Sequence, residues 1–118
     1  MNDRLKFRIW NKRLSRYLDK YDPTPMLMSN GNLAYLDDAG MKFYEVEQCT
    51  GLKDRNGKLI YKNDVVYDKI DECYKVAYWD NGAYCWALRW NNVCREPLQD
   101  GSDLVVCGNI HENNELLK

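Results

Sequence analysis

The sequence has 118 residues, a formal net charge of −1, and 45% apolar and 30% charged side chains. This length allows one core of ordinary size, and this composition excludes a disordered chain. The near-zero charge excludes a protein that is basic throughout. The aromatic content of 13% favours β-structure, because aromatic rings suit the half-buried surface of a sheet.

The N-terminal segment alternates basic and apolar side chains. Leu5, Phe7 and Ile9 recur with period two, which predicts a half-buried strand with a basic outer face. Residues 11–13 predict a turn. Residues 14–21 carry apolar side chains at helical spacing, but prolines follow closely, so we expect a short returning strand instead.

The next segments also have the pattern of strands and turns. Asn30-Gly31 predicts a tight β-hairpin between residues 26–28 and 33–36, because this dipeptide tolerates positive φ angles. Residues 43–49 then alternate as an extended segment. Further strands are expected over residues 65–67, 74–79, 84–90 and 104–107, with a turn at 80–82, a polar loop over 91–103 and a helical turn over 115–118.

Short strands separated by turn signals are typical of antiparallel β-proteins. We therefore expect a mainly β fold, a small antiparallel barrel-like or sandwich domain with at most short helical turns. The chain shows no linker and no internal repeat, so a single domain over residues 1–118 is predicted.

Residues 50–66 form the most constrained stretch of the sequence. Asp54-Arg55-Asn56-Gly57 predicts a turn, and Gly51 relieves the backbone at a strand end. Leu52, Leu59 and Ile60 are expected in the core. The lysines of the stretch are expected in solvent. Asp64 is expected to accept a hydrogen bond from nearby amides as a cap or turn residue.

This stretch resembles the YopX family, in which Thr-Gly-Leu-Lys-Asp precedes an Asn-Gly turn, then Ile-Tyr, Gly-Asp and two branched apolar residues. Asn63 stands here where the family has that glycine. Residues 6–10, ending in Trp10, and residues 108–117 are similar to the ends of the family's pattern. The positions that carry the resemblance as structural signatures are Thr50, Gly51, Leu52, Asn56, Gly57, Ile60, Tyr61, Asp64, Gly108, Asn109 and Ile110.

The resemblance implies a protein encoded by a bacteriophage or an integrated prophage, and it brings a family of unassigned function without catalytic residues. No apolar run approaches the ~18 residues of a membrane span, so no membrane contact is expected. The five cysteines are odd in number and lack a Cys-x-x-Cys pair. We therefore expect reduced thiols in the cytoplasm of a bacterial host cell.

Positive charge concentrates near the N-terminus. Residues 1–20 hold seven basic and two acidic side chains, a balance of +5, which leaves −6 on the rest of the chain. This bias is compatible with a phosphate-binding face, with an acidic partner, or with complementary faces of one domain or of two copies. The candidate nucleic-acid face comprises Arg4, Lys6, Arg8, Lys12, Arg13 and Arg16.

A second candidate surface is aromatic: Trp79, Tyr84, Trp86 and Trp90. These side chains have three possible uses, which we rank as core packing, then an interface for another protein, then stacking on single-stranded nucleic acid. Tyr84, Trp86 and Trp90 are expected on one face of the same strand.

Catalytic and metal signatures are weak. His111 is the sole histidine and lacks a visible nucleophile, so a structural role in a turn is expected. The cysteines lie at least nine residues apart, unlike zinc ligands. Cys85 and Cys107 are expected in strands as small hydrophobic residues, and Cys94 is expected to be the most reactive thiol. The acidic clusters Asp37-Asp38, Asp71-Glu72 and Asp100/Asp103 are expected in solvated loops. We expect no cofactor, no metal and no enzymatic activity.

The leading functional hypothesis is a non-enzymatic protein-binding or self-assembling module, with a homo-oligomer, a host protein or a phage protein as partner. Sheet edges and the aromatic strand are the expected contact surfaces. The alternative is a nucleic-acid-binding small β-barrel that uses the basic N-terminal face. An enzyme with a concave pocket ranks third.

Overall fold

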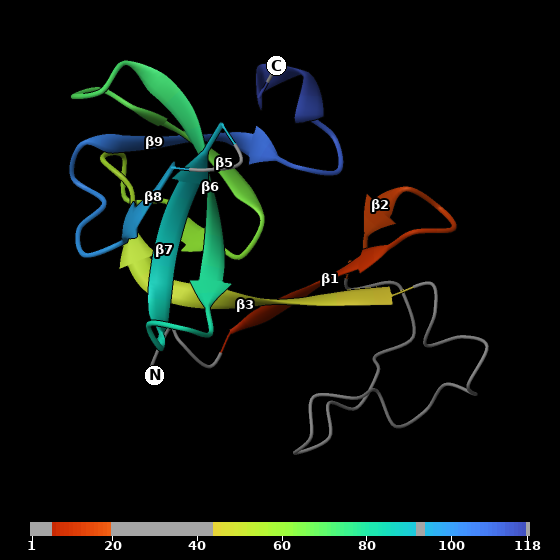
Figure 1. Cartoon of the computed structure of the whole chain (residues 1–118). Helices are drawn as coiled ribbons and strands as arrows, with labels where there is room; N and C mark the ends of the chain where they lie inside the picture. Colours follow the sequence, from red (N-terminus) through yellow and green to blue (C-terminus); the bar gives the residue numbers. More distant parts are fainter. Residues whose placement is uncertain (1–5, 20–43, 92–93, 118) are drawn as a thin grey trace. The chain divides into compact units, whose positions relative to one another are not determined.

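The computed structural model describes residues 6–19, 44–91 and 94–117 (Figure 1). The predicted hairpin over residues 26–36, the Asp37-Asp38 pair and Arg4 lie outside this part of the chain. Within the described ranges, the fold is mainly β, with two antiparallel sheets and a single 3-10 turn as its helical element, which confirms the predicted class. In the same ranges, no helix is long and apolar enough to cross a membrane.

The described residues contain nine strands and one 3-10 turn. Their bounds are β1 Phe7–Asn11, β2 Arg16–Tyr17, β3 Tyr44–Lys53, β4 Leu59–Tyr61, β5 Asp64–Asp68, β6 Cys73–Asp80, β7 Cys85–Trp90, β8 Cys94–Pro97 and β9 Leu104–Asn109, followed by the 3-10 turn η2 Asn114–Leu117. The described residues form two compact units, one from Phe7–Glu47 and one from Lys6 together with the chain from Gln48 onward. The single domain stays a prediction.

The smaller unit contains the predicted N-terminal hairpin. β1 pairs with the short β2 in antiparallel register, with Trp10 opposite Tyr17. Asn11 closes the turn, because its Oδ1 accepts hydrogen bonds from the backbone N–H groups of Arg13 and Leu14. The expected burial is wrong in part: Phe7 is exposed, whereas Trp10 and Asn11 at the end of β1 are buried.

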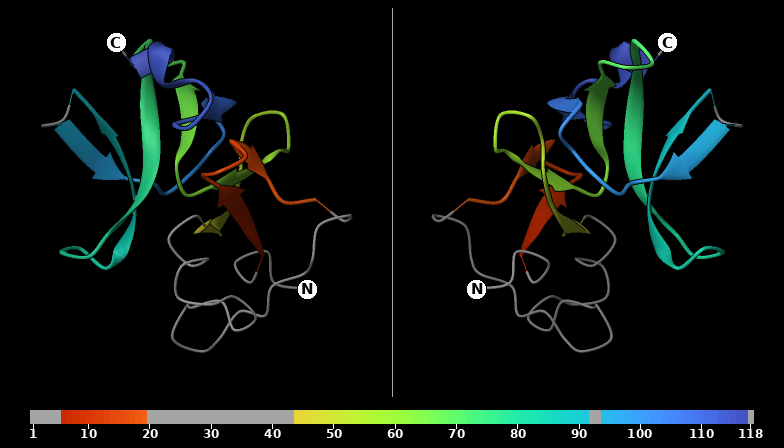
Figure 2. Two further views of the ribbon diagram at one scale, coloured as in Figure 1. Left: turned by 90° about the vertical axis from the view of Figure 1, so that its right-hand side faces the viewer. Right: turned by 90° about the vertical axis from the view of Figure 1, so that its left-hand side faces the viewer.

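The larger unit is organised around a five-stranded sheet in the order β8-β7-β6-β5-β9, seen from two sides in Figure 2. β5, β6 and β7 form the meander that the sequence predicts. β8 was not expected, since residues 94–97 lie in the predicted polar loop. It forms because Cys94–Pro97 pair with β7 through four consecutive residues.

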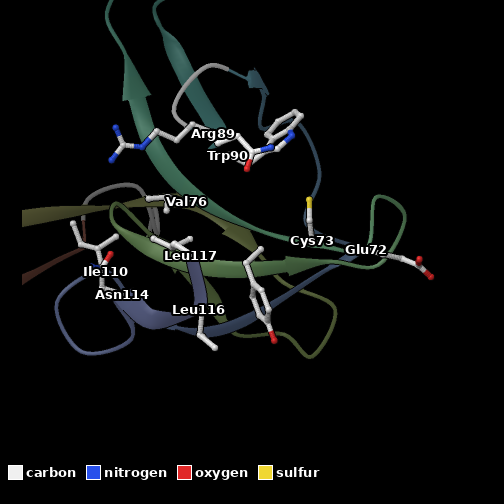
Figure 3. Close-up of a pocket in the computed structure, with 11 residues that line it drawn as sticks. Glu72, Cys73, Val76, Arg89, Trp90, Ile110, Asn114, Leu116 and Leu117 are labelled. Atoms are coloured by element: carbon white, nitrogen blue, oxygen red, sulfur yellow. The ribbon is translucent and has the colours of Figure 1, made fainter.

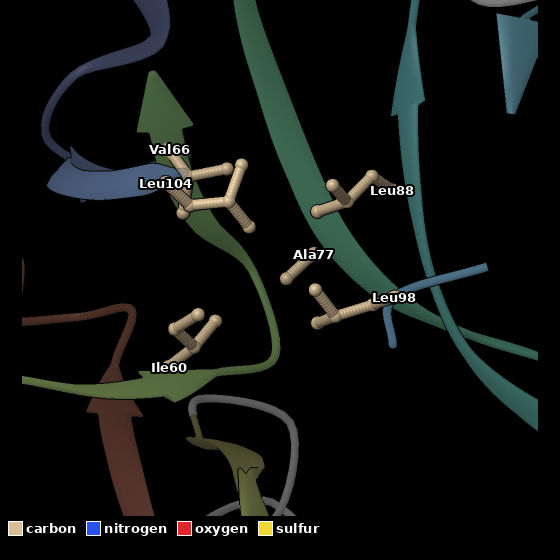
Figure 4. Close-up of a cluster of buried hydrophobic side chains, with 6 residues drawn as sticks. All are labelled: Ile60, Val66, Ala77, Leu88, Leu98 and Leu104. Atoms are coloured by element: carbon tan, nitrogen blue, oxygen red, sulfur yellow. The ribbon is translucent and has the colours of Figure 1, made fainter. Parts of the chain in front are cut away.

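The core lies on one face of this sheet and is formed by aliphatic side chains from successive elements (Figure 4). Alternation along β6 and β7 turns Ala77 and Leu88 toward it, and the two residues are directly opposite in register. The buried cluster comprises Ile60, Val66, Ala77, Leu88, Leu98 and Leu104.

Candidate functional site

The aromatic residues do not form one continuous surface, because they lie at different ends of the β6–β7 hairpin. Trp79 and Trp86 are directly opposite in register, and their rings meet edge to face at 5.4 Å. Trp86 packs against the core, while Trp79 is 41% exposed. Tyr84 lies in the turn that precedes β7 instead of within the strand, and it is 82% exposed. We call Trp79, Tyr84 and Trp86 the aromatic end.

The backbone of Tyr84 has a φ of 53°, in the left-handed region. An aromatic side chain is unfavourable there, and a glycine or asparagine would adopt this conformation at lower cost. The turn is otherwise well formed, since Asp80 Oδ1 accepts hydrogen bonds from the N–H groups of Gly82 and Ala83. A strained, exposed tyrosine is therefore a feature that turn formation alone does not require.

Trp90, the remaining predicted aromatic, has a structural role at the other end of the hairpin. The Nζ of Lys75 lies 4.1 Å from the centre of its ring. Lys75 is fully buried in β6, on the face that also carries Ala77. Sequence reasoning missed this lysine, because alternation predicts which face a residue occupies but not whether a charge there is paired.

Three carboxylates surround the ammonium group of Lys75. Its Nζ lies 2.8 Å from Asp68 Oδ2, 2.6 Å from Asp71 Oδ2 and 2.6 Å from Glu96 Oε1. These partners come from β5, from the turn before β6 and from β8, so the Lys75 cluster joins separate strands. Asp71 lies in an exposed turn, as expected, but its carboxylate is also paired with Lys75.

The pKa values of the cluster reflect these contacts. Burial lowers the pKa of Lys75, but the hydrogen bonds to the three carboxylates outweigh it and hold the pKa well above the usual value. Burial raises the pKa of Asp68, yet the hydrogen bonds from Lys75 and from the amides of Asp71 and Ile70 keep it below the usual value. Both groups are charged at neutral pH.

The carboxylate oxygens of Asp68, Asp71 and Glu96 lie within 4.8 Å of one another, a spacing that could hold a metal ion. The ammonium of Lys75 already lies among them and supplies the positive charge. We therefore interpret this cluster as an internal ion-pair network and not as a metal site. The five cysteines are free. Cys94 is half-buried in β8, and Cys107 lies in a strand, β9, as predicted, but its side chain is exposed.

The other face of the β6–β7 hairpin carries a groove of ≈ 630 Å³ (Figure 3). Val76 and Arg89, directly opposite in β6 and β7, face away from the core here, since their neighbours Ala77 and Leu88 face toward it. Leu116 and Leu117 of η2 form its second wall. The lining, which we call the outer groove, comprises Glu72, Cys73, Tyr74, Val76, Arg89, Trp90, Asn91, Ile110, Asn114, Leu116 and Leu117.

The C-terminal signature builds one side of the outer groove. Asn109 Oδ1 accepts hydrogen bonds from the N–H groups of His111 and Glu112, and its own N–H donates to Asn113 Oδ1. Gly108 is required there, because a Cβ would lie 2.0 Å from Asn113 Oδ1. The resulting tight turn presents Ile110 to the groove. His111 lies in this turn, as predicted from the sequence.

The central signature is structural, and its main function is to hold the edge of β9. Asp54 accepts hydrogen bonds from the N–H groups of Asn56 and Lys58 within its own turn and from Val106 in β9. The N–H of Arg55 also donates to Leu104 O. Burial raises the pKa of Asp54, but these backbone donors outweigh it and lower the pKa below the usual value.

The remaining signature residues fix the path from β3 to β5. Thr50 Oγ1 donates to Ile60 O, and Asp64 Oδ2 accepts a hydrogen bond from the N–H of Tyr61. Asn63 has a φ of 72°, so the left-handed turn predicted from its replacement of glycine is present. Gly51 and Gly57 have φ angles of 85° and 83°, although Gly51 lies within β3 instead of at its end.

The predicted basic face is partly neutralised within the smaller unit. Arg8 Nε lies 2.7 Å from Glu47 Oε1, and its guanidinium stacks over Tyr17 at 4.6 Å. Glu47 is fully buried, so this pair stabilises the hairpin. Lys12, Arg13 and Arg16 are exposed in and beside the β1–β2 turn. Lys6 is exposed before β1 and is grouped with the larger unit.

These features define a mainly β protein whose signature turns stabilise the fold, and the contacts of the described residues assemble no catalytic group. The YopX protein family model matches residues 6–118. The chain therefore belongs to the YopX family, as the resemblance of residues 50–66 predicts.

Two solved structures share the fold. The crystal structure of protein EF1440 from Enterococcus faecalis has 24% sequence identity and a TM-score of 0.62, covering 96% of this chain and 97% of that one. The crystal structure of protein yopX from Bacillus subtilis has 18% identity and a TM-score of 0.59, covering 100% of both chains. No curated protein sequence matches the chain. Neither relative indicates a catalytic role.

Replacing Lys75 with methionine tests the Lys75 cluster. The Lys75→Met variant is expected to lose about 3 kcal/mol of unfolding free energy or more, because it leaves three carboxylates facing one another without a cation. Urea unfolding at neutral pH measures the loss. Lys69→Met is the matched control, since Lys69 is exposed in the adjoining turn; equal stability of the two variants would contradict the role of Lys75.

The lowered pKa values of Asp54 and Asp68 predict an acid-sensitive fold. A depressed folded-state pKa contributes stability above the unfolded-state pKa, near 4, and this stability is lost as pH falls through the folded value. Urea unfolding midpoints between pH 6 and pH 2.5 are expected to fall most steeply below about pH 4. The decline is expected to be shallower in Asp54→Asn. A pH profile in that variant equal to that of the wild type would show that the Asp54 carboxylate does not cause the acid sensitivity.

Proposed function

We propose that this protein is a non-enzymatic protein-binding module that associates with itself through the aromatic end of the β6–β7 hairpin. The observation that carries the proposal is Tyr84, which is 82% exposed on a strained backbone beside the half-exposed Trp79. Exposed aromatic side chains are typical anchors of protein interfaces. Backbone strain at Tyr84 is expected to persist where its side chain contributes to binding, because strained residues cluster at functional sites.

The sheet edges support this choice of surface, because both edge strands of the five-stranded sheet are protected against pairing with a strand of another chain. The backbone of β9 is engaged by Asp54 and Arg55 on the side away from β5. β8 is only four residues long, carries Arg95 and Glu96 at its centre, and ends with Pro97. Short charged strands with proline discourage strand addition. Association through the aromatic end is therefore favoured over association through an edge.

The proposed setting is the bacterial cytoplasm of a phage-infected or prophage-carrying cell. It follows from the family resemblance and from the free thiols expected of a reducing compartment. A host or phage protein could use the same surface as a second copy of the chain.

Substituting Tyr84 by asparagine separates binding from folding. Tyr84→Asn is expected to raise the unfolding free energy by about 1 kcal/mol, because asparagine tolerates the left-handed conformation better than tyrosine. The same variant is expected to weaken self-association at least tenfold through loss of the anchor. Urea unfolding and light scattering over a concentration series measure the two effects.

The control for Tyr84→Asn is Leu14→Ser, which removes another exposed apolar side chain, 56% exposed, from the β1–β2 turn. This change is expected to leave association unaltered. A wild-type chain that stays monomeric at millimolar concentration would refute the proposed self-association, as would a Tyr84→Asn variant that assembles like the wild type.

Nucleic-acid binding is the second candidate function, favoured by the exposure of Lys12, Arg13 and Arg16 around one hairpin turn. If it holds, fluorescence anisotropy with single- and double-stranded oligonucleotides at 20 mM salt is expected to show binding that weakens steeply toward 200 mM. The double variant Lys12→Ala/Arg13→Ala is expected to lose most of that signal. Absence of any signal at low salt would remove this function.

A further inference from the structure

We propose that the aromatic end of one copy docks into the outer groove of a second copy, so that the chains associate head to tail. This inference rests on the self-association proposed above and adds the receiving site. The outer groove was not apparent from the sequence, because its walls come from β6, β7 and the C-terminal turn. It is a concave surface of the larger unit with an apolar floor, which suits an aromatic ligand.

The outer groove is open and has an apolar floor, while its rim carries both apolar and polar groups. Val76 closes its floor at 4% exposure, while Leu117 and Tyr74, each 36% exposed, border it. A pocket with an aliphatic floor and open sides accepts the ring of a tyrosine or tryptophan, and such anchors dominate the energetics of protein interfaces. The volume of ≈ 630 Å³ leaves room for more than one ring.

The aromatic end and the outer groove lie at opposite ends of the β6–β7 hairpin. Figure 1 shows the turn between β6 and β7 at one end and η2 near the other. Val76 in the groove floor and Trp79 at the aromatic end are three residues apart in β6, roughly 10 Å at ~3.3 Å per residue, and their side chains point to opposite faces of the sheet. The aromatic end therefore cannot reach the groove of its own chain. Two different surfaces that fit each other produce a head-to-tail contact between copies.

Charged residues at the two surfaces favour a second copy of the chain as the ligand and fix the orientation in which it binds. Asp80 lies beside Trp79 at the aromatic end, and Arg89 lies in the groove. Figure 3 shows Arg89 and Glu72 at opposite ends of the groove. An incoming aromatic end is attracted with Asp80 toward Arg89 and is repelled from Glu72. The chain thus carries both halves of a complementary pair.

The C-terminal signature gains a function in this arrangement. Gly108 and Asn109 shape the turn that presents Ile110 and positions η2, so they build the wall against which the aromatic end would pack. Contacts limited to a groove and a hairpin end bury a small area. Weak association that depends on concentration is therefore expected.

The test uses two full-length variants, each lacking one half of the contact. Tyr84→Asn keeps the groove intact, whereas Leu117→Glu places a charge in the groove and keeps the aromatic end intact. Leu117 is partly exposed in η2, so this change is compatible with folding. Glu115→Gln is its matched control, because Glu115 lies in the same turn but outside the groove lining.

Sedimentation equilibrium is run on the wild type, on each variant and on an equimolar mixture of the two. We expect the wild type and Glu115→Gln to associate progressively, and each of the other two variants to remain at 14.0 kDa. The mixture is expected to form a complex of two chains, since one intact contact remains and cannot propagate.

Three other outcomes would overturn the inference. A mixture that stays monomeric would show that the two surfaces do not meet. A Leu117→Glu variant that assembles like the wild type would place the receiving surface elsewhere, for example in a symmetric contact between two aromatic ends, and would leave the proposed self-association standing. A wild type that is monomeric throughout would refute the self-association and this inference together.

Discussion

The ion-pair network around Lys75 is the constraint on which the larger unit depends. A buried ammonium is tolerated only where its charge is balanced and its hydrogen bonds are made. Asp68, Asp71 and Glu96 meet this requirement from β5, the following turn and β8, and the ring of Trp90 covers the same group. The position of β8 beside β7 is thus coupled to a charge in β6, which fixes the sheet more specifically than apolar packing alone.

The signature residues that this chain shares with the family stabilise its turns and strand ends. Asp54 organises its own turn and also holds the edge of β9, while Asn109 and Gly108 shape the C-terminal turn. Carboxylates and amides in these roles satisfy backbone donors that would otherwise be left without partners at strand ends. Function is therefore better sought on residues outside the signatures, such as Tyr84 and the lining of the outer groove.

The protected sheet edges and the exposed aromatic end both support the proposed self-association, in which side chains and not strand edges make the contact. Strand addition is discouraged at β8 by its charges and Pro97, and at β9 by the Asp54 turn. An interaction through side chains on a hairpin end can be specific and weak, because it does not use the backbone groups that any extended chain could pair with. The family membership is compatible with such a binding role and assigns no chemistry.

The sequence by itself determined the mainly β class, the family, most of the described strands and the Asp54–Gly57 turn, because alternation and turn residues act over a few positions. It could not locate β8, since Cys94–Pro97 become a strand only when β7 lies alongside. It also could not show that Trp90 lies at the other end of the β6–β7 hairpin from Trp79 and Trp86, or that Lys75 is buried. Those properties depend on which side chains meet across strands, and only the tertiary structure decides which charges are paired and which aromatic rings remain exposed.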